Sequence, residues 1–250
     1  MKLLGTQNAK TVKGETAGYL TGIVYLAPSD SSSALGNPAA RWNTCAMASK
    51  GCRAACLYTA GRGRMPNVSA ARLRKTARFF EDREGFMADL VDDIRALKRK
   101  AAKLDLTPAV RLNGTSDLRW ERFPLVVDGE HFANIMAVFP DVQFYDYTKI
   151  PGRHGRFGFP ANYHLTFSRS ESNQDAVEAE AAAGRNIAVV FAGDLPESYL
   201  GRPVVSGDET DLRFLDPDGC VVGLTAKGDA KKDGSGFVVQ AGTADLGMAA

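Results

Sequence analysis

The sequence has no long apolar run and almost no imbalance of charge. No stretch approaches the ~20 apolar residues that a membrane-spanning helix needs, and residues 1–8 lack the apolar core of a secretory signal peptide. We therefore expect a protein of the cytoplasm, with no membrane partner. Lysine and arginine outnumber aspartate and glutamate by only 31 to 29, so net charge does not decide whether nucleic acid is a partner.

Basic side chains are nevertheless concentrated in two segments. Residues 62–78 carry six of them with no acid between, and residues 95–103 carry five more. Such runs are usually the solvated face of a helix. The alternative is a surface that binds the phosphates of a nucleic acid, which would supply affinity without reading sequence.

Cysteine is also scarce, and its distribution is the most informative feature of the chain. Three of the four cysteines, Cys45, Cys52 and Cys56, fall within twelve residues, whereas Cys220 stands far away. In a reducing cytoplasm such a group indicates metal binding or catalysis more often than disulfides. Three thiolates can hold three irons of a [4Fe–4S] cluster and leave the fourth iron open for chemistry, whereas a fourth thiolate would close the cluster.

Two other interpretations of the cysteines stay open. A zinc ion would need a fourth ligand, which Cys220 or one of the histidines could supply; these are His131, His154 and His164. Structural zinc sites usually contain close pairs of cysteines, and only Cys52 and Cys56 resemble such a pair. The other interpretation is that the thiols bind no metal. Cys220 lies in an apolar run, and we expect it to be a buried, inert thiol.

Apolar patterns along the chain alternate between strand and helix. Strand patterns occupy residues 19–27, 109–113, 142–147, 163–167, 187–191, 220–225 and 237–240. Helical patterns begin near Asn67, strengthen in residues 86–104, and recur in residues 131–139 and 173–183. Asn67 would cap the first helix, whose apolar side is expected at Val68, Ala71, Ala77 and Phe80.

Strands interleaved with helices are typical of an α/β fold with parallel strands. About six such units favour a partial (β/α)6 TIM-like barrel, with the cysteine loop after the first strand. An open sheet is the alternative. We expect a single domain over residues 1–241 and a loose tail over residues 242–250.

Several of the predicted strands end in polar residues. These polar segments are residues 113–117, 145–149, 168–171, 193–194 and 225–227. Active sites of βα barrels lie at the carboxyl ends of the strands, so the five segments could face one cavity beside the cysteine loop. Loops are polar in most proteins, and it is the common placement of these segments that favours a site.

With its three-cysteine loop after the first strand of a partial barrel, the chain resembles the radical S-adenosylmethionine superfamily. Its cysteines are separated by six and three residues, which is wider than that superfamily's usual spacing. The wider spacing, the run 52–63 and the strand ends 113–117 and 145–149 are similar to those of small phage-encoded radical-SAM-like iron–sulfur proteins. Some members of that group are implicated in hypermodification of thymine bases in phage DNA.

The resemblance implies a cofactor set and a reaction. Cys45, Cys52 and Cys56 would ligate a [4Fe–4S] cluster, and the open iron would be chelated by S-adenosyl-L-methionine. One electron would then break a carbon–sulfur bond of that molecule and yield a 5′-deoxyadenosyl radical. The implied enzyme is an isomerase acting on a glycyl-thymidine type of base, in DNA or as a nucleotide, in the cytoplasm of a phage host. A flavodoxin or ferredoxin would be the reductant, and we expect a monomer.

Strand-end placement supplies the remaining candidate residues. Asn113, Ser116 and Asp117 are the first candidates for holding S-adenosyl-L-methionine, and Ser168 and Arg169 are the next. Tyr147 and Lys149 are the candidate catalytic groups on the substrate side.

Two rival functions remain. One is a zinc-stabilised nucleic-acid-binding or replication accessory protein without catalysis. The other is a protein that keeps an iron–sulfur cluster for structure or redox sensing and does no chemistry on S-adenosyl-L-methionine.

Overall fold

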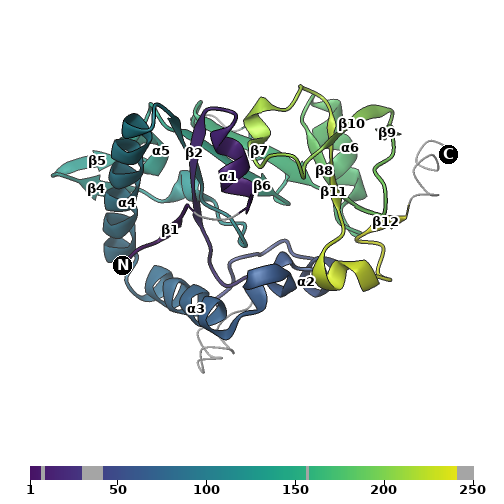
Figure 1. Cartoon of the computed structure of the whole chain (residues 1–250), viewed down its shortest axis with the longest axis horizontal. Helices are drawn as coiled ribbons and strands as arrows, with labels where there is room; N and C mark the ends of the chain where they lie inside the picture. The colour runs from purple at the N-terminus through teal and green to yellow at the C-terminus, as the bar shows by residue number, and fades with distance from the viewer. Residues whose placement is uncertain (7–8, 30–41, 156–157, 241–250) are drawn as a thin grey trace. The chain divides into compact units, whose positions relative to one another are not determined.

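The computed structural model describes residues 1–6, 9–29, 42–155 and 158–240, and these form an α/β fold (Figure 1). The strands are β1 (Leu4–Gly5), β2 (Tyr19–Val24), β3 (Thr107–Arg111), β4 (Leu125–Val127), β5 (Glu130–Phe132), β6 (Gln143–Thr148), β7 (Tyr163–Ser168), β8 (Ile187–Ala192), β9 (Ser198–Tyr199), β10 (Arg202–Ser206), β11 (Val221–Thr225) and β12 (Val239–Gln240). The α-helices are α1 (Ala9–Glu15), α2 (Lys50–Ala54), α3 (Pro66–Glu81), α4 (Arg83–Lys103), α5 (Ile135–Val138) and α6 (Gln174–Ala182). Short 3-10 helices are η3 (Leu57–Thr59), η4 (Gly61–Arg64), η5 (Trp120–Arg122), η6 (Arg213–Leu215) and η7 (Gly228–Lys232).

Ten strands form a mostly parallel sheet in the order β1-β2-β3-β6-β7-β8-β11-β10-β9, with β12 also paired to β8. Parallel pairs include β2 with β3, β3 with β6, β7 with β8 and β8 with β11. The two end strands, β1 and β9, run antiparallel to their neighbours. The α/β class with parallel strands is therefore confirmed. Among the strands described, β1 and β9 do not pair with each other, so a closed barrel is not seen.

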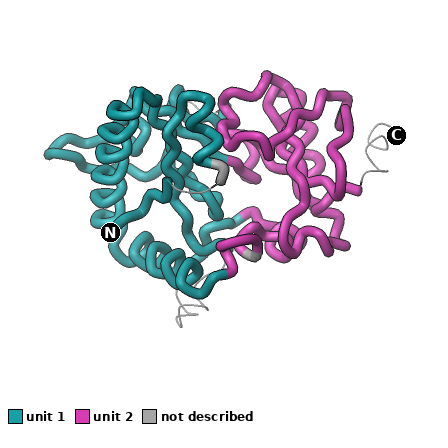
Figure 2. Tube along the Cα trace, viewed as in Figure 1, with its two compact units in different colours: residues 1–46, 65–146, 154–164 teal, residues 47–64, 147–153, 165–250 magenta. Residues whose placement is uncertain are grey.

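The chain divides into two compact units (Figure 2). Unit 1 consists of residues 1–46, 65–146 and 154–164, and unit 2 consists of residues 47–64, 147–153 and 165–250. The predicted single domain over residues 1–241 stays a prediction. The predicted tail, residues 242–250, lies outside the described residues. No helix within the described ranges has the length and apolar character needed to cross a membrane.

Helix α4 supplies one wall of the core of unit 1. Phe86, Leu90, Ile94 and Leu97 are buried along it at three- and four-residue spacing, as the sequence predicts. Strand β2 accommodates this face closely at Gly22, where a Cβ atom would lie 3.1 Å from a methyl group of Leu97. The predicted pattern extended to residue 104, which instead follows the end of the helix and is half-exposed.

The preceding helix, α3, differs from its prediction in start and in orientation. It begins at Pro66 with Met65 as the N-cap, so the predicted cap at Asn67 is wrong. Proline is favoured in the first turn because its missing N–H would have no partner there. The buried face is formed by Arg72, Thr76 and Phe79, whereas the predicted apolar side at Val68, Ala71, Ala77 and Phe80 is only partly buried.

The segment 131–139, predicted as one helix, is helical only in residues 135–138. Its first part is strand β5, which pairs antiparallel with β4 and opposes Leu125 to Phe132. The two strands are joined by Asp128 and Gly129, both at positive φ, 52° and 85°. A turn with positive φ at both central residues matches the twist of a two-residue hairpin. Helix α5 is confined to four residues and is capped by the Asn134 side chain, which accepts from the N–H of Ala137.

Strand β8 forms the centre of unit 2. Ile187, Val189 and Phe191 alternate along it and pack with Phe167 and Val177 in one buried cluster. Strand β11 pairs along one edge of β8 from residue 187 to residue 191. Strand β7 pairs with residues 187–188 and β12 with residues 191–192. Since β11 occupies one edge of β8, β7 and β12 share the other edge, with β7 at its start and β12 at its end.

Candidate functional site

Cys45 lies in unit 1, beyond the carboxyl end of strand β2. Its N–H donates to Oδ1 of Asn43 (2.8 Å), and its sulfur lies 3.7 Å from the carbonyl oxygen of Thr115. The preceding residue, Thr44, is fully buried, and its hydroxyl donates to the carbonyl oxygen of Ala27 (2.7 Å). The first cysteine is therefore fixed against the segment that follows β2, although its own side chain is only half-buried.

The turn after strand β3, residues 113–117, packs on the same segment. The Gly114 N–H donates to the carbonyl oxygen of Val24 (3.0 Å), and the Thr115 hydroxyl donates to that of Leu26 (2.5 Å). A Cβ atom at Gly114 would lie 2.7 Å from the Val24 oxygen, so only glycine fits. The N–H of Asp117 donates to the carbonyl oxygen of Thr44 (2.7 Å). The structure thus brings the turn predicted at a strand end next to the first cysteine.

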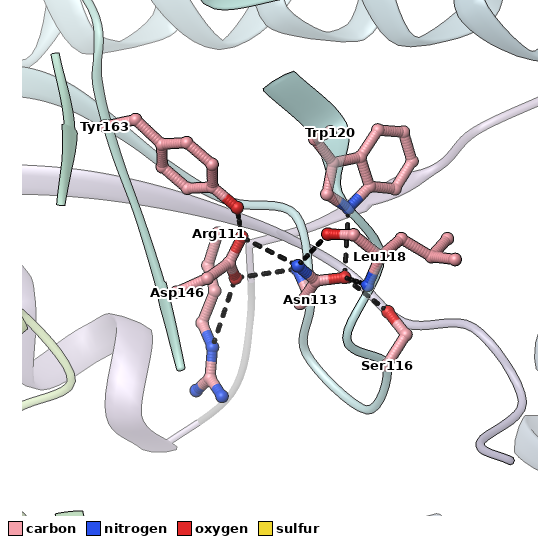
Figure 3. Close-up of polar contacts among 7 residues, drawn as sticks. All are labelled: Arg111, Asn113, Ser116, Leu118, Trp120, Asp146 and Tyr163. Carbon is pink, nitrogen blue, oxygen red and sulfur yellow. Dashed lines mark hydrogen bonds and ion pairs between the residues drawn. The ribbon is translucent and has the colours of Figure 1, made fainter. Parts of the chain in front are cut away.

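Asn113 organises this turn from a buried position (Figure 3). Its side-chain oxygen accepts hydrogen bonds from the hydroxyl of Ser116 (2.8 Å), the N–H of Leu118 (2.9 Å) and the indole of Trp120 (3.0 Å). Its amide group donates to the carbonyl oxygen of Leu118 (3.0 Å) and to Asp146 (3.2 Å). A primary amide offers two donor hydrogens and one acceptor oxygen. Asn113 uses both kinds of group in hydrogen bonds within the chain. The predicted role of Asn113 and Ser116 in cofactor binding stays a prediction.

Asp146, in strand β6, is the anionic centre of the same network (Figure 3). Its side chain is completely buried, and it accepts from the N–H of Asn113 (2.7 Å) and the hydroxyl of Tyr163 (2.8 Å). The guanidinium of Arg111 lies 3.9 Å from it and supplies the opposite charge. A buried carboxylate is stable only when it is hydrogen-bonded and paired. Sequence analysis included this residue in a polar strand end but assigned it no role.

Cys52 and Cys56 lie in unit 2, around the short helix α2. Ser49 is the N-cap, and its hydroxyl oxygen accepts from the N–H of Cys52 (3.1 Å). Cys56 lies past the end of α2 and serves as the N-cap residue of η3. Cys52 packs against an apolar cluster that includes Ala55 and Phe237. Both cysteines are half-buried.

The carboxylate of Glu171, from the loop after strand β7, binds the start of helix α2. It accepts from the hydroxyl of Ser49 (2.7 Å) and from the N–H of Gly51 (2.7 Å). Burial by itself would raise the pKa of Glu171, but these two hydrogen bonds and one from its own backbone outweigh burial and hold the pKa below its usual value. Glu171 is therefore anionic at neutral pH. The role of Glu171 has no local signal in the sequence, because its partners are 122 and 120 residues away.

The remaining predicted residues of unit 2 lie in or just beyond β6 and β7. Tyr147 packs against the cluster that contains Ala188 and Cys220, and the ammonium of Lys149 lies 5.6 Å from the centre of the Phe237 ring. Ser168, buried at the end of β7, accepts a hydrogen bond from Asn173 at its carbonyl oxygen (3.0 Å). The guanidinium of Arg169 donates to the carbonyl oxygens of Gly236 (2.7 Å) and Phe237 (3.1 Å).

Metal ligation by the cysteines is untested by the geometry. Within residues 1–6, 9–29, 42–155 and 158–240, no three side chains of histidine, cysteine, aspartate or glutamate form a group that could hold a metal ion. Cys45 belongs to unit 1, whereas Cys52 and Cys56 belong to unit 2. None of the four cysteines forms a disulfide.

Cys220 differs from the other three cysteines in its surroundings. It is completely buried among Ala188 and Val222. Burial and the nearby carboxylate of Asp216 raise the pKa of its thiol to about 11. This environment fits the predicted inert thiol, because the thiolate is the nucleophile and the metal ligand.

We expect Cys220 to resist alkylation in the folded, metal-free protein. Iodoacetamide at about pH 8 should label Cys45, Cys52 and Cys56 and leave Cys220 unlabelled until denaturant is added, because the reagent attacks thiolates. Mass spectrometry of tryptic peptides measures the labelling site by site. Labelling of Cys220 at the rate of the other three would contradict the assignment.

The basic runs are partly neutralised within the chain. In unit 1, Arg95 pairs with Asp128 (2.5 Å) and Lys98 pairs with Asp141 (2.6 Å). In unit 2, Arg64 pairs with Asp229 (2.7 Å). These are exposed pairs, which contribute little to stability. They agree with the interpretation of the second run as a solvated face, whereas in the first run Arg72 is buried on α3. A nucleic-acid surface stays a prediction.

The fold and the cysteine loop together define an α/β protein in which half-buried thiols follow the first parallel strand. The chain belongs to the GP88 (gene product 88) family, whose model matches residues 2–241. Neither the curated proteins nor the solved structures contain a match to it.

Proposed function

We propose that this protein is a [4Fe–4S]-dependent radical S-adenosylmethionine enzyme. The observation that carries the proposal is the contrast between its cysteines. Cys45, Cys52 and Cys56 form no disulfide and are half-buried within one short segment, whereas Cys220 is buried with a raised pKa. Three accessible thiols are the donor set that a cubane cluster with one open iron needs.

The donor chemistry of the cysteine segment fits the cluster. Residues 47–64 of unit 2 contain four basic residues, Lys50, Arg53, Arg62 and Arg64, and no acid. When bound, the cluster supplies one electron to S-adenosyl-L-methionine and thereby the reactive radical.

The order of the parallel strands supports the finer fold prediction. Strands β2, β3, β6, β7, β8 and β11 occur in the same order in the chain and in the sheet. A partial (β/α)6 barrel has this order, and its site lies at the carboxyl ends of the strands. Cys45 and residues 113–117 lie at the carboxyl ends of β2 and β3. This shared position is the second support for the proposal.

Within this proposal the strand ends bind and orient the small molecules. Asp117 and Arg169 would bind the charged groups of S-adenosyl-L-methionine, since each carries a charge beside a strand end. Asn113 and Ser116 would act through the turn that they hold in place. Tyr147 and Lys149 would face the substrate, for which we propose a modified thymine base of the glycyl-thymidine type. The family's numbered gene-product name supports a phage origin and hence a host cytoplasm and a host flavodoxin or ferredoxin as reductant.

The reaction is tested with reduced protein and S-adenosyl-L-methionine. We expect release of 5′-deoxyadenosine in amounts that exceed one molecule per chain when dithionite or a flavodoxin system supplies electrons. Chromatography of the quenched mixture measures it, and Cys52→Ala protein is the matched control that should release none. Iron-loaded protein that releases no 5′-deoxyadenosine with any reductant would contradict the enzyme proposal.

One observation favours a second candidate, an iron–sulfur protein with a structural or redox-sensing cluster. Asn113, the first candidate for binding S-adenosyl-L-methionine, has its donors and its acceptor oxygen engaged within the chain. Retention of the cluster without cleavage of S-adenosyl-L-methionine would establish this candidate.

A further inference from the structure

Glu171 connects the end of strand β7 to the helix that carries Cys52. It lies three residues after Ser168, the last residue of β7. One carboxylate oxygen accepts from the Ser49 hydroxyl and the other from the Gly51 N–H, both at 2.7 Å. The Ser49 oxygen accepts in turn from the N–H of Cys52 (3.1 Å). A continuous chain of hydrogen bonds therefore leads from Glu171 to the backbone of a cysteine.

These contacts satisfy the first turn of helix α2. The N–H groups in the first turn of a helix have no partner inside the helix. In α2, the N–H of Gly51 is bonded to Glu171, and that of Cys52 is bonded to Ser49. Glu171 thus holds one of these groups directly and the other through the hydroxyl that it fixes.

Close packing around Gly51 holds the same turn from another direction. A Cβ atom at this position would lie 2.1 Å from the hydroxyl of Ser235 and 2.8 Å from both Phe237 Cβ and a Glu171 oxygen. Ser235 is itself fixed by a hydrogen bond to Asp233 (2.6 Å). The start of α2 is therefore enclosed between Glu171 and the loop at residues 233–237, all within unit 2.

We propose that Glu171 is a positioning residue that holds Cys52 and Cys56 in place for metal before any metal is bound. The inference rests on the proposed function, because it assigns these two cysteines to a cluster. A ligand segment that is already ordered loses less conformational entropy when the cluster binds. Removal of Glu171 should therefore loosen α2 in the metal-free chain and weaken the retention of iron in the loaded chain.

Hydrogen exchange of the metal-free protein tests the first part. In Glu171→Ala, the amides of Gly51 and Cys52 should exchange about tenfold faster or more, because a charge-assisted acceptor is lost. Glu171→Gln keeps one acceptor and should give an intermediate rate. Glu178→Gln is the matched control. Glu178 is exposed on α6, where it accepts a hydrogen bond from the side chain of Gln174 (2.9 Å), so the exchange of Gly51 and Cys52 in this variant should match that of the wild type.

Amides of strand β8 serve as the internal standard for folding, and their exchange should not change in Glu171→Ala. If they also exchange faster, Ser49→Ala decides, because this variant leaves the carboxylate in place and removes only the cap. Faster exchange of the Cys52 amide in Ser49→Ala supports the proposal. An unchanged rate at residues 51 and 52 in a folded Glu171→Ala protein would overturn it.

Iron retention tests the second part and separates the two proposals. Transfer of iron from the loaded protein to a chelator should be about tenfold faster in Glu171→Ala than in the wild type, and unchanged in Glu178→Gln. Wild-type protein that retains no iron would refute the proposed function. Wild-type protein that retains iron no longer than Glu171→Ala protein would refute only the role of Glu171.

Discussion

Replacement of Cys45, Cys52 or Cys56 by alanine is expected to abolish iron binding, whereas Cys220→Ala retains the wild-type content. With only two thiolates, two irons of the cluster would have no protein ligand, and the cluster would no longer be retained. Cys220 is buried with a pKa near 11 and is unsuited to ligation. Iron and acid-labile sulfide, measured per chain after anaerobic reconstitution, check the expectation.

Cys220→Ala also serves as the matched control for this series, because it removes a thiol without removing a proposed ligand. Each variant should keep the far-ultraviolet circular dichroism of the metal-free wild type, so that loss of iron is not loss of fold. Loss of iron in Cys220→Ala together with the other three would indicate a four-thiolate site and remove the open coordination position. Iron retained by any one of the other three variants would exclude that cysteine as a ligand.

Asp146→Ala is expected to give the largest loss of stability in unit 1. The substitution leaves the buried N–H of Asn113 and the Tyr163 hydroxyl without their acceptor and Arg111 without its counter-charge. Removal of one partner from a buried charged network costs about 3–5 kcal/mol. Urea unfolding followed by circular dichroism measures the change, which should lower the midpoint at an unchanged slope.

Two variants with smaller expected losses of stability serve as comparisons. Tyr163→Phe removes one hydrogen bond to the same carboxylate and should cost about 1 kcal/mol. Asp141→Ala, at an exposed partner of Lys98, should cost less than about 1 kcal/mol because surface ion pairs contribute little. Equal losses in Asp146→Ala and Asp141→Ala would show that the network around Asp146 does not stabilise the fold.

Segments with a clear apolar pattern predicted their helices and strands correctly, because the apolar side chains that repeat along them are the ones that become buried. Strand β8 is an unbroken apolar run, and helix α4 repeats Phe86, Leu90 and Ile94 on one face. The segment 131–139 was predicted only in part, because a short apolar run does not distinguish helix from strand. The preceding Asp128 and Gly129 are the turn signal that could have identified the hairpin there.

The sequence predicts the thiols and strand ends of the candidate site, but not the residues that hold them in place. The three cysteines are visible from spacing alone, and residues 113–117 were placed beside the first of them by the rule that parallel strands end at one edge. Glu171 and Asp146 lie within the polar strand ends 168–171 and 145–149, but nothing local indicates their roles. Their partners are 120 and 33 residues away in the sequence, so only the folded chain reveals that one holds a cysteine helix and the other a strand end.

The central claim is a cubane with one iron free of protein ligands. Mössbauer spectroscopy of protein purified without oxygen, recorded before and after addition of S-adenosyl-L-methionine, tests it most directly. We predict about four irons per chain, with one of them changing its spectrum on addition while the other three do not. Protein that contains about one zinc instead would contradict the account. So would protein with four irons whose spectra are all unchanged by S-adenosyl-L-methionine.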